Sequence, residues 1–205
     1  MHNRLSQEEL EQGYKLLFDG QSLEGWGTTN GSDGWGVEDD CIVCLVKGDG
    51  YVYTREKYEN FVLKTDYRID PGVNSGIFFR WSDLTDPVNT GLEMQVLDTA
   101  HKEEAGIHDC GALYDLAVPS ANAALPAGEW NHVEIVCEGS RIRLHLNGTC
   151  TVDVDIDRWA EVGKNPDGTP NKFAYAWSGM PRLGHIGFQD HGGKVWYRNI
   201  KLLPL

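Results

Sequence analysis

The sequence is poor in the features that mark a membrane protein or a nucleic-acid-binding protein. Its 205 residues contain no apolar run approaching the roughly 18 residues that a membrane span needs. No cluster of Lys and Arg stands out, and a net charge of −13 repels phosphate backbones. We therefore expect neither a membrane nor a nucleic acid as partner, and the sequence leaves the oligomeric state open.

A secretion signal and a disulfide framework are also missing. Residues Met1 to Ser6 have no apolar core of the kind a signal peptide needs, which predicts a cytoplasmic protein, or a periplasmic or secreted one whose signal has been removed. The five cysteines are an odd number, which favours reduced thiols. Cys41 and Cys44 have C-x-x-C spacing without a second such pair. Because residues three apart in a strand face opposite ways, we expect buried thiols there rather than a metal or redox site.

Helical patterning is confined to the beginning of the chain. Ser6 and Glu9 form a capping-box pattern, and Gly13 ends the predicted helix. After it, apolar and polar residues alternate with a period of two, as in strands with one buried face. From Phe61 to Ile69 the odd positions predict that face. The same alternation recurs in later runs: Leu92 to Asp98, His132 to Glu138, Arg141 to Asn147, Thr151 to Ile156, His185 to Gln189 and Val195 to Leu202.

These runs predict an all-β fold. They amount to about ten to fourteen short strands without helical crossovers, and Asn147-Gly148 is a strong hairpin turn. Such a pattern favours an antiparallel β-sandwich with a short N-terminal helix. No repeat, low-complexity tract or linker divides the chain, so we expect one domain over residues 1–205. Several strands carry polar side chains on the face away from the core, which either line a groove or are simply solvated.

One long segment departs from this alternation. Arg158 to Gly184 is rich in Gly and Pro, yet it contains the large side chains of Trp159, Phe173, Tyr175 and Trp177. Long loops that carry large side chains form binding walls or lids more often than idle connections. We therefore expect this segment to border a binding site.

Short motifs along the chain occur in an order that characterises one family. They are Gly13 to Gly20, Gly25-Trp26, Phe61 to Arg68, Asn74 to Ile77 with Arg80, Gly91 to Asp98, Gly111 to Asp115, Gly128 to Asn131, Leu146 to Gly148 and Gly187 to Gly192. Together they cover essentially the whole chain, which resembles the 3-keto-disaccharide hydrolase family. The resemblance implies a concanavalin-A-like, jelly-roll β-sandwich. It also implies action on glycosides whose sugar ring carries a ketone at C3.

A ketone at C3 changes how a glycosidic bond can break. The C2–H beside the carbonyl becomes acidic, so a base can remove it and form an enolate. The enolate then expels the C1 substituent, and water can add to the resulting enone. This route needs a general base and a group that stabilises the enolate oxygen. It need not use the two opposed carboxylates of an ordinary glycosidase, and both a hydrolase and a lyase or hydratase outcome fit it.

Three residues are candidates for the catalytic acid and base: Glu93, Asp98 and His191. Glu93 shares a strand face with Gln95 and can point rigidly into a groove; alternatively it is an exposed carboxylate or pairs with Arg80. Asp98 ends that strand, where the loops of a sandwich gather, although Asp is also a common turn residue. His191 lies in a polar turn and titrates near working pH, although it too could serve the turn alone.

Seven further residues are candidates for contacts with the sugar. The amides of Gln95 and Gln189 can bind hydroxyl groups, and the alternative is a buried amide satisfied by the backbone. Tyr114 and Trp177 can stack on a sugar ring, and a core role is the alternative for both. The others could bind hydroxyls or steady an enolate, or could shape a turn that enters a strand: Asn74, Ser75 and Arg80.

The sequence requires no cofactor, but a divalent ion is another way to polarise the ketone. Glu93, Asp98 and His191 offer the mixed oxygen and nitrogen ligands that such an ion would take. The main alternative to an enzyme is a non-catalytic, lectin-like carbohydrate-binding module, because the same fold, aromatics and amides would serve it. An ordinary endo-glucanase of this fold would want a Glu-x-Asp-x-x-Glu strand, which residues 91–98 do not supply.

Overall fold

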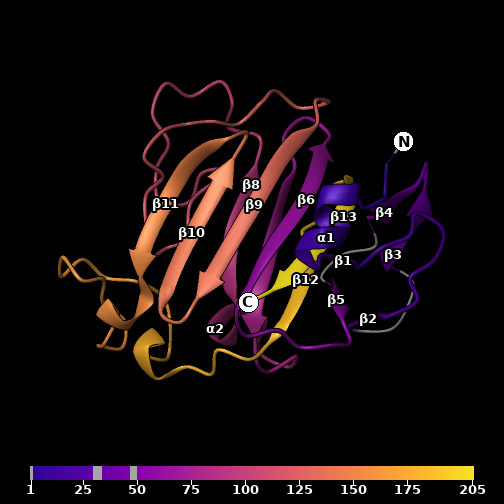
Figure 1. Ribbon diagram of the computed structural model, residues 1–205. Coiled ribbons are helices and arrows are strands. Elements are labelled where there is room, and N and C mark those ends of the chain that lie inside the picture. The colour runs from indigo at the N-terminus through magenta and orange to yellow at the C-terminus, as the bar shows by residue number, and fades with distance from the viewer. Residues whose placement is uncertain (1, 30–33, 47–49) are drawn as a thin grey trace.

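Two antiparallel sheets make up most of the computed structural model, which describes residues 2–29, 34–46 and 50–205 (Figure 1). The strands are β1 Lys15–Leu16, β2 Trp26–Thr28, β3 Trp35–Glu38, β4 Cys41–Cys44, β5 Gly50–Thr54, β6 Phe61–Ile69, β7 Asn74–Trp81, β8 Leu92–Leu97, β9 Asn131–Glu138, β10 Arg141–Leu146, β11 Thr149–Asp155, β12 His185–Asp190 and β13 Val195–Pro204. The helices are α1 Gln7–Gln12 and α2 Pro87–Thr90, with single 3₁₀ turns η2 Ile156–Arg158 and η3 Trp177–Gly179. Within the described ranges, every helix is too short and too polar to cross a bilayer.

The sheets differ in size and stack face to face (Figure 1). The large sheet runs β11-β10-β9-β6-β13-β4-β3, with β1 also paired to β13. The small sheet runs β2-β5-β12-β7-β8, and the strand pairs in both sheets are antiparallel. This arrangement confirms the all-β sandwich predicted from the alternating runs.

The core lies between the two sheets and is built from alternate residues of their strands. On β6, Phe61, Leu63 and Tyr67 are fully buried, as the odd-position pattern predicts. The rings of Phe188 on β12 and Tyr197 on β13 stack across the core with centroids 3.8 Å apart and planes inclined by 7°. Burying a large apolar side chain of this kind contributes about 1.5–3 kcal/mol to folding stability. Packing of the inward faces therefore fixes the positions of the residues on the outward faces.

The local signals of the sequence appear where they were predicted. Ser6 and Glu9 form the reciprocal capping box of α1, and Gly13 ends the helix in the left-handed conformation at a φ of 92°. Asn147 and Gly148, with φ of 50° and 82°, make the hairpin turn between β10 and β11. A type I′ turn requires positive φ at both central residues, and Asn-Gly adopts it readily.

The C-x-x-C pair is separated by the sheet itself. Cys44 belongs to the core between the sheets, whereas Cys41 packs on the outer side with Val43 and Trp196. This confirms that the two thiols face opposite ways. Burial raises the pKa of Cys41 to about 11 and that of Cys44 to about 12, so both remain as neutral thiols at neutral pH.

Candidate functional site

The outward face of the small sheet carries one continuous row of residues across all its strands. The register pairs Gly27 with Tyr53, Tyr53 with Gly187, Gly187 with Phe78 and Phe78 with Glu93. Because directly opposite residues share a face of the sheet, these five positions all point away from the core. Glu93 is therefore the one acidic side chain in a row otherwise made of aromatic residues and glycines.

Glycines let the larger side chains of this face lie flat on the sheet. The ring of Tyr53 lies over Gly27, where an added Cβ would be 2.7 Å from its Cζ atom. The carboxyl group of Glu93 lies over Gly76 on β7, where an added Cβ would be 2.8 Å from the carboxyl carbon. Contacts under 3.0 Å require something to move, so both glycines hold space that the neighbouring side chains occupy.

The carboxyl group of Glu93 is held in a poorly solvated position. The residue is half-buried, and no hydrogen bond to its side chain is found in the described part of the chain. Desolvation raises the pKa of Glu93 to about 8, and the positive charge of Lys172 opposes that rise. A carboxyl group with these surroundings is available for proton transfer near neutral pH.

Two loops lie beside Glu93. Tyr114 donates its backbone N–H to the carbonyl of Glu93 at 2.9 Å, and the ammonium of Lys172 lies 4.1 Å from the centroid of the Tyr114 ring. Asp115 joins the two loops, because it accepts the backbone N–H of Lys172 at 2.7 Å and contacts Nε2 of His108 at 2.6 Å. Burial, followed by the charges of Glu93 and Asp115, raises the pKa of Tyr114, which therefore stays protonated as a possible donor.

Lys172 belongs to the long segment that the sequence marks as a binding wall. This segment leaves β11 and crosses below α2 before it enters β12 (Figure 1). Ala174 donates its backbone N–H to Oδ1 of Asn89 on α2 at 3.0 Å, which anchors the segment beside the small sheet. Its position next to Glu93 agrees with the role expected for it.

Amide side chains continue the polar strip beyond Glu93. Gln95 is buried and donates from Nε2 to Oδ1 of Asn74 at 2.8 Å. Gln189 donates from Nε2 to the hydroxyl of Tyr51 at 3.1 Å. Gln95 pairs with Gly76, so its side chain lies on the same face as Glu93. Three of the predicted sugar-binding residues, Asn74, Gln95 and Gln189, thus lie on one face with Glu93.

Three other predicted contacts lie elsewhere. Ser75 is fully buried and bonds within the core to the Tyr197 hydroxyl at 2.9 Å. Arg80 is buried and donates to the carbonyl of Glu59 at 2.9 Å, so it does not pair with Glu93. Trp177 is only 5% exposed and packs in the core, which leaves no open ring face for a sugar. The residues next to them in the sequence do not predict this burial, because it depends on which face of each strand is turned toward the core.

His191 lies at one end of the small sheet. It is exposed in the turn after β12, at the end of the sheet where β7 begins with Asn74. The carboxyl group of Glu93 lies over Gly76, two residues further along β7, which corresponds to about 7 Å along the strand. That Glu93 and His191 share one hollow stays a prediction.

Asp98 has a structural role in a turn. Its Oδ2 accepts the backbone N–H of Gly72 at 2.8 Å, which ties the end of β8 to the turn before β7. The ligand set expected for a divalent ion, with Glu93, Asp98 and His191, is therefore not assembled. Among the described residues, no cluster of three or more His, Cys, Asp or Glu side chains is placed to hold a metal ion.

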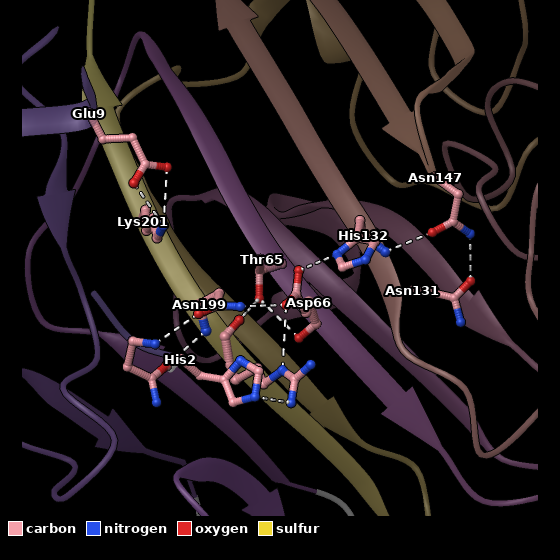
Figure 2. Close-up of polar contacts among 11 residues, drawn as sticks. His2, Glu9, Thr65, Asp66, Asn131, His132, Asn147, Asn199 and Lys201 are labelled. Atoms are coloured by element: carbon pink, nitrogen blue, oxygen red, sulfur yellow. Dashed lines mark hydrogen bonds and ion pairs between the residues drawn. The ribbon is translucent and has the colours of Figure 1, made fainter. Parts of the chain in front are cut away.

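A hollow of about 380 Å³ lies on the outward face of the large sheet around Asp66, and polar residues supply most of its lining. Figure 2 shows Asp66 between His132 and Asn199, whose ring Nδ1 and amide Nδ2 lie 2.7 and 2.6 Å from its oxygens. Arg198 adds a third contact at 3.4 Å. This carboxylate already has three partners, so it is a structural group rather than a candidate base. The candidate site is therefore the face that carries Glu93.

The sequence interpretation missed Lys172, Tyr51 and Tyr53. The two tyrosines alternate in Gly50 to Thr54, a period-two signal that places both on one face, but nothing local says that this face is the open one. Lys172 lies in the long segment without a motif of its own. Only the packing of that segment over β8 brings its charge to Glu93.

Comparisons with known proteins bear on the family and the fold. A family model described as a 3-keto-alpha-glucoside-1,2-lyase-like domain matches residues 13–203. A 3-keto-disaccharide hydrolase from Bacteroides thetaiotaomicron is 27% identical over 94% of this chain and 79% of its own length. A crystal structure from Parabacteroides distasonis, of a protein provisionally named a glycosyl hydrolase, has 30% identity and a TM-score of 0.83, covering 94% of this chain and 99% of its own. The carbohydrate-binding module CBM66 of Bacillus subtilis, 17% identical with a TM-score of 0.55 over 86% of this chain and 94% of its own, shares the fold.

Proposed function

The chain belongs to the 3-keto-alpha-glucoside-1,2-lyase-like domain family, and from that premise we propose that it cleaves glycosides whose sugar ring carries a ketone at C3. The observation that carries the proposal is Glu93. It is a desolvated carboxyl group near the charge of Lys172, and it lies on the outward face of the small sheet between two loops. We assign Glu93 as the general base.

Cleavage begins with proton transfer from C2 of the sugar to Glu93. The electron pair of the C2–H bond becomes the C2–C3 double bond, and the carbonyl electrons move to the oxygen on C3. The ketone then reforms, the C2–C3 electron pair becomes a C1–C2 double bond, and the C1–O bond breaks with its electron pair on the leaving oxygen. The leaving group takes a proton from protonated Glu93. Water adds to C1 of the enone and C2 regains a proton, which completes hydrolysis. Without the addition of water, the outcome is that of a lyase.

The raised pKa of Glu93 suits this first step. A carboxylate with an ordinary pKa near 4.5 is a weak base toward a C–H bond, whereas one with a pKa of about 8 is both stronger and still partly deprotonated near neutral pH. Desolvation alone raises this pKa, and it needs no second carboxylate. This matches a route in which the ketone, and not an acid on the opposite face, activates the bond.

Lys172 and Tyr114 are placed to stabilise the enolate oxygen. They lie together, with the Lys172 ammonium 4.1 Å from the centre of the Tyr114 ring, and both interact electrostatically with Glu93. A cation and a protonated phenol beside the base provide the charge stabilisation that an enolate requires. Gln95, Gln189 and Asn74 would bind sugar hydroxyl groups along the same face.

The test compares oxidised and unoxidised sugars. The wild-type chain is expected to turn over 3-keto-trehalose or a 3-keto-glucoside but not the parent sugar, and Glu93→Gln is expected to lower kcat by about a thousandfold or more, because the amide cannot accept the C2 proton. Glu134→Gln, on the outward face of the large sheet, is the matched control and should retain activity. Loss of activity in both variants, or in neither, contradicts the assignment.

Further arms of the same experiment separate the alternatives. Exchange of the C2 hydrogen for deuterium in D₂O, lost in Glu93→Gln, supports proton removal as the first step. Binding of keto sugars without turnover would favour a lectin-like module instead. Loss of activity on dialysis against a chelator, restored by a divalent ion, would assign polarisation of the ketone to a metal rather than to Lys172.

A further inference from the structure

A hollow lies on the same outward face as Glu93. Its volume is about 470 Å³, and β2, β5 and the segment before α2 line it with Thr28, Tyr51, Tyr53, Leu84 and Thr85. None of the described residues that line it carries a charge. Apart from Leu84 and a proline, the lining consists of hydroxyl-bearing residues, two of them aromatic. Such a surface accommodates a neutral, hydroxyl-rich molecule better than a phosphate or a carboxylate.

The hollow and Glu93 are separated by a short stretch of sheet. The Glu93 carboxyl lies over Gly76 of β7, and Tyr51 and Tyr53 belong to β5, two strands away across β12. Two strand spacings correspond to about 10 Å. Two sugar rings joined end to end bridge a gap of this size, one ring beside Glu93 and the other against the tyrosines.

Aromatic rings form the surface between the two positions. Gly187 of β12 has no side chain, and the ring of Trp81 lies over it, 3.1 Å from where a Cβ would be. Trp81 is fully buried, with Tyr51 at 5.1 Å and Tyr53 at 5.8 Å between ring centroids, and the ring of Phe78 lies 5.1 Å from that of Tyr51. The tyrosine rings are thus fixed at the hollow by the packed rings that lie between it and Glu93.

We propose that this hollow binds the leaving group of the reaction, a neutral second sugar or similar aglycone attached to C1, while the 3-keto ring lies beside Glu93. The inference deepens the proposed function and rests on it. It makes the Tyr51–Tyr53 side of the sheet the determinant of which 3-keto-glycosides are preferred. Substrates with a small aglycone do not reach the hollow and do not depend on it.

The test fills the hollow without touching the base. Thr85 is exposed at the rim, so Thr85→Trp occupies the space with little risk to folding. We expect KM for a 3-keto-disaccharide to rise about tenfold or more, with KM and kcat for a methyl 3-keto-glucoside unchanged within about twofold. Tyr53→Ala should also raise KM for the disaccharide alone. Val162→Trp, at a 61% exposed position of the long segment, is the control for adding an indole to the surface.

The outcomes distinguish this inference from the function on which it rests. If the wild type cleaves both substrates and Thr85→Trp affects them equally or not at all, the hollow is not the leaving-group site and the function stands. If the wild type cleaves neither substrate, the proposed function is contradicted. Direct measurement of glucose binding then tests whether the hollow is a sugar site. Glucose binding that Thr85→Trp abolishes would support a sugar site there, and equal binding by both proteins would overturn it.

Discussion

At the scale of single residues, Glu93 joins two properties that rarely occur together on a protein surface. Its side chain belongs to the open face of a sheet, yet its surroundings disfavour the charged form strongly enough to raise its pKa to about 8. Asp153 on β11 differs from it, because that carboxylate is exposed and pairs with Arg141. The difference arises from the burial of the Glu93 carboxyl.

The pH dependence of the reaction tests this protonation. A base must be deprotonated to act, so we expect kcat/KM for a 3-keto-glucoside to rise with pH through a midpoint of about 8. The positive charge of Lys172 lowers the pKa of Glu93, so Lys172→Met should move that midpoint to higher pH. Lys164→Met, which removes an exposed lysine paired with Glu161 in the same segment, should leave it in place. A profile that falls through the same midpoint would identify Glu93 as an acid instead.

At the scale of elements, the approach of β7 to β8 sets where the base points. Gly76 leaves the space that the Glu93 carboxyl occupies, and a methyl group there would collide with it. Gly76→Ala should therefore displace the carboxyl and lower kcat by about tenfold or more, since catalytic geometry tolerates little displacement. Steady-state kinetics together with thermal unfolding measure the two effects separately.

The matched control is Gly179→Ala on η3. A Cβ at that glycine meets no atom within 4 Å, and its backbone is not in the left-handed region. Activity and stability should both remain near those of the wild type. Equal kinetics for Gly76→Ala and the wild type would show that the carboxyl position in the structure is not the catalytic one.

Sequence patterns predict the strands and turns of this chain better than they predict which strands pair in the sheets. Phe61 to Ile69 forms β6 with the predicted bounds, and Asn147-Gly148 makes the predicted hairpin turn between β10 and β11. Both follow from the sequence because alternation and turn chemistry are local properties. The order of strands in each sheet depends on contacts between residues far apart in the chain. No local signal places β12 between β5 and β7, and that placement aligns Tyr53 with Glu93.

The same limit explains which site residues were predictable. Glu93, Gln95 and Asn74 follow from alternation on β7 and β8, which are adjacent in sequence and in the sheet. His191 and Trp177 looked equally suitable by residue type. His191 lies in an exposed turn after β12, and Trp177 is buried in the core cluster. Residue type indicates what a side chain can do, and tertiary packing decides whether it faces the site.

At the scale of the whole molecule, the outward faces of the two sheets have different roles. The large sheet carries the network around Asp66, in which the carboxylate is 10% exposed and contacts His132, Asn199 and Arg198. The small sheet carries Glu93, whose charged form is disfavoured by desolvation and favoured by the charge of Lys172. The core separates the faces, so a change on one should affect stability without altering chemistry on the other.

Asp66→Ala tests this separation. Removing one partner from a nearly buried charged network should lower the free energy of unfolding by about 3 kcal/mol, because Arg198 loses its counter-charge. We expect kcat for a 3-keto-glucoside to stay unchanged at a temperature where the variant is folded. Asp153→Ala, which breaks the exposed pair with Arg141, should cost at most about 1 kcal/mol. A large loss of kcat in Asp66→Ala would show that the two faces are coupled.

The distribution of thiols has a practical consequence for handling the molecule. Cys41, Cys44, Cys110 and Cys137 are enclosed, and Cys150 alone among the five reaches solvent, on β11 of the large sheet. A maleimide reagent applied to the folded chain will therefore attach at one position. Tethered to a sensor chip through that sulfur, every molecule presents Glu93 and the neighbouring tyrosines on the opposite sheet to the flowing sample.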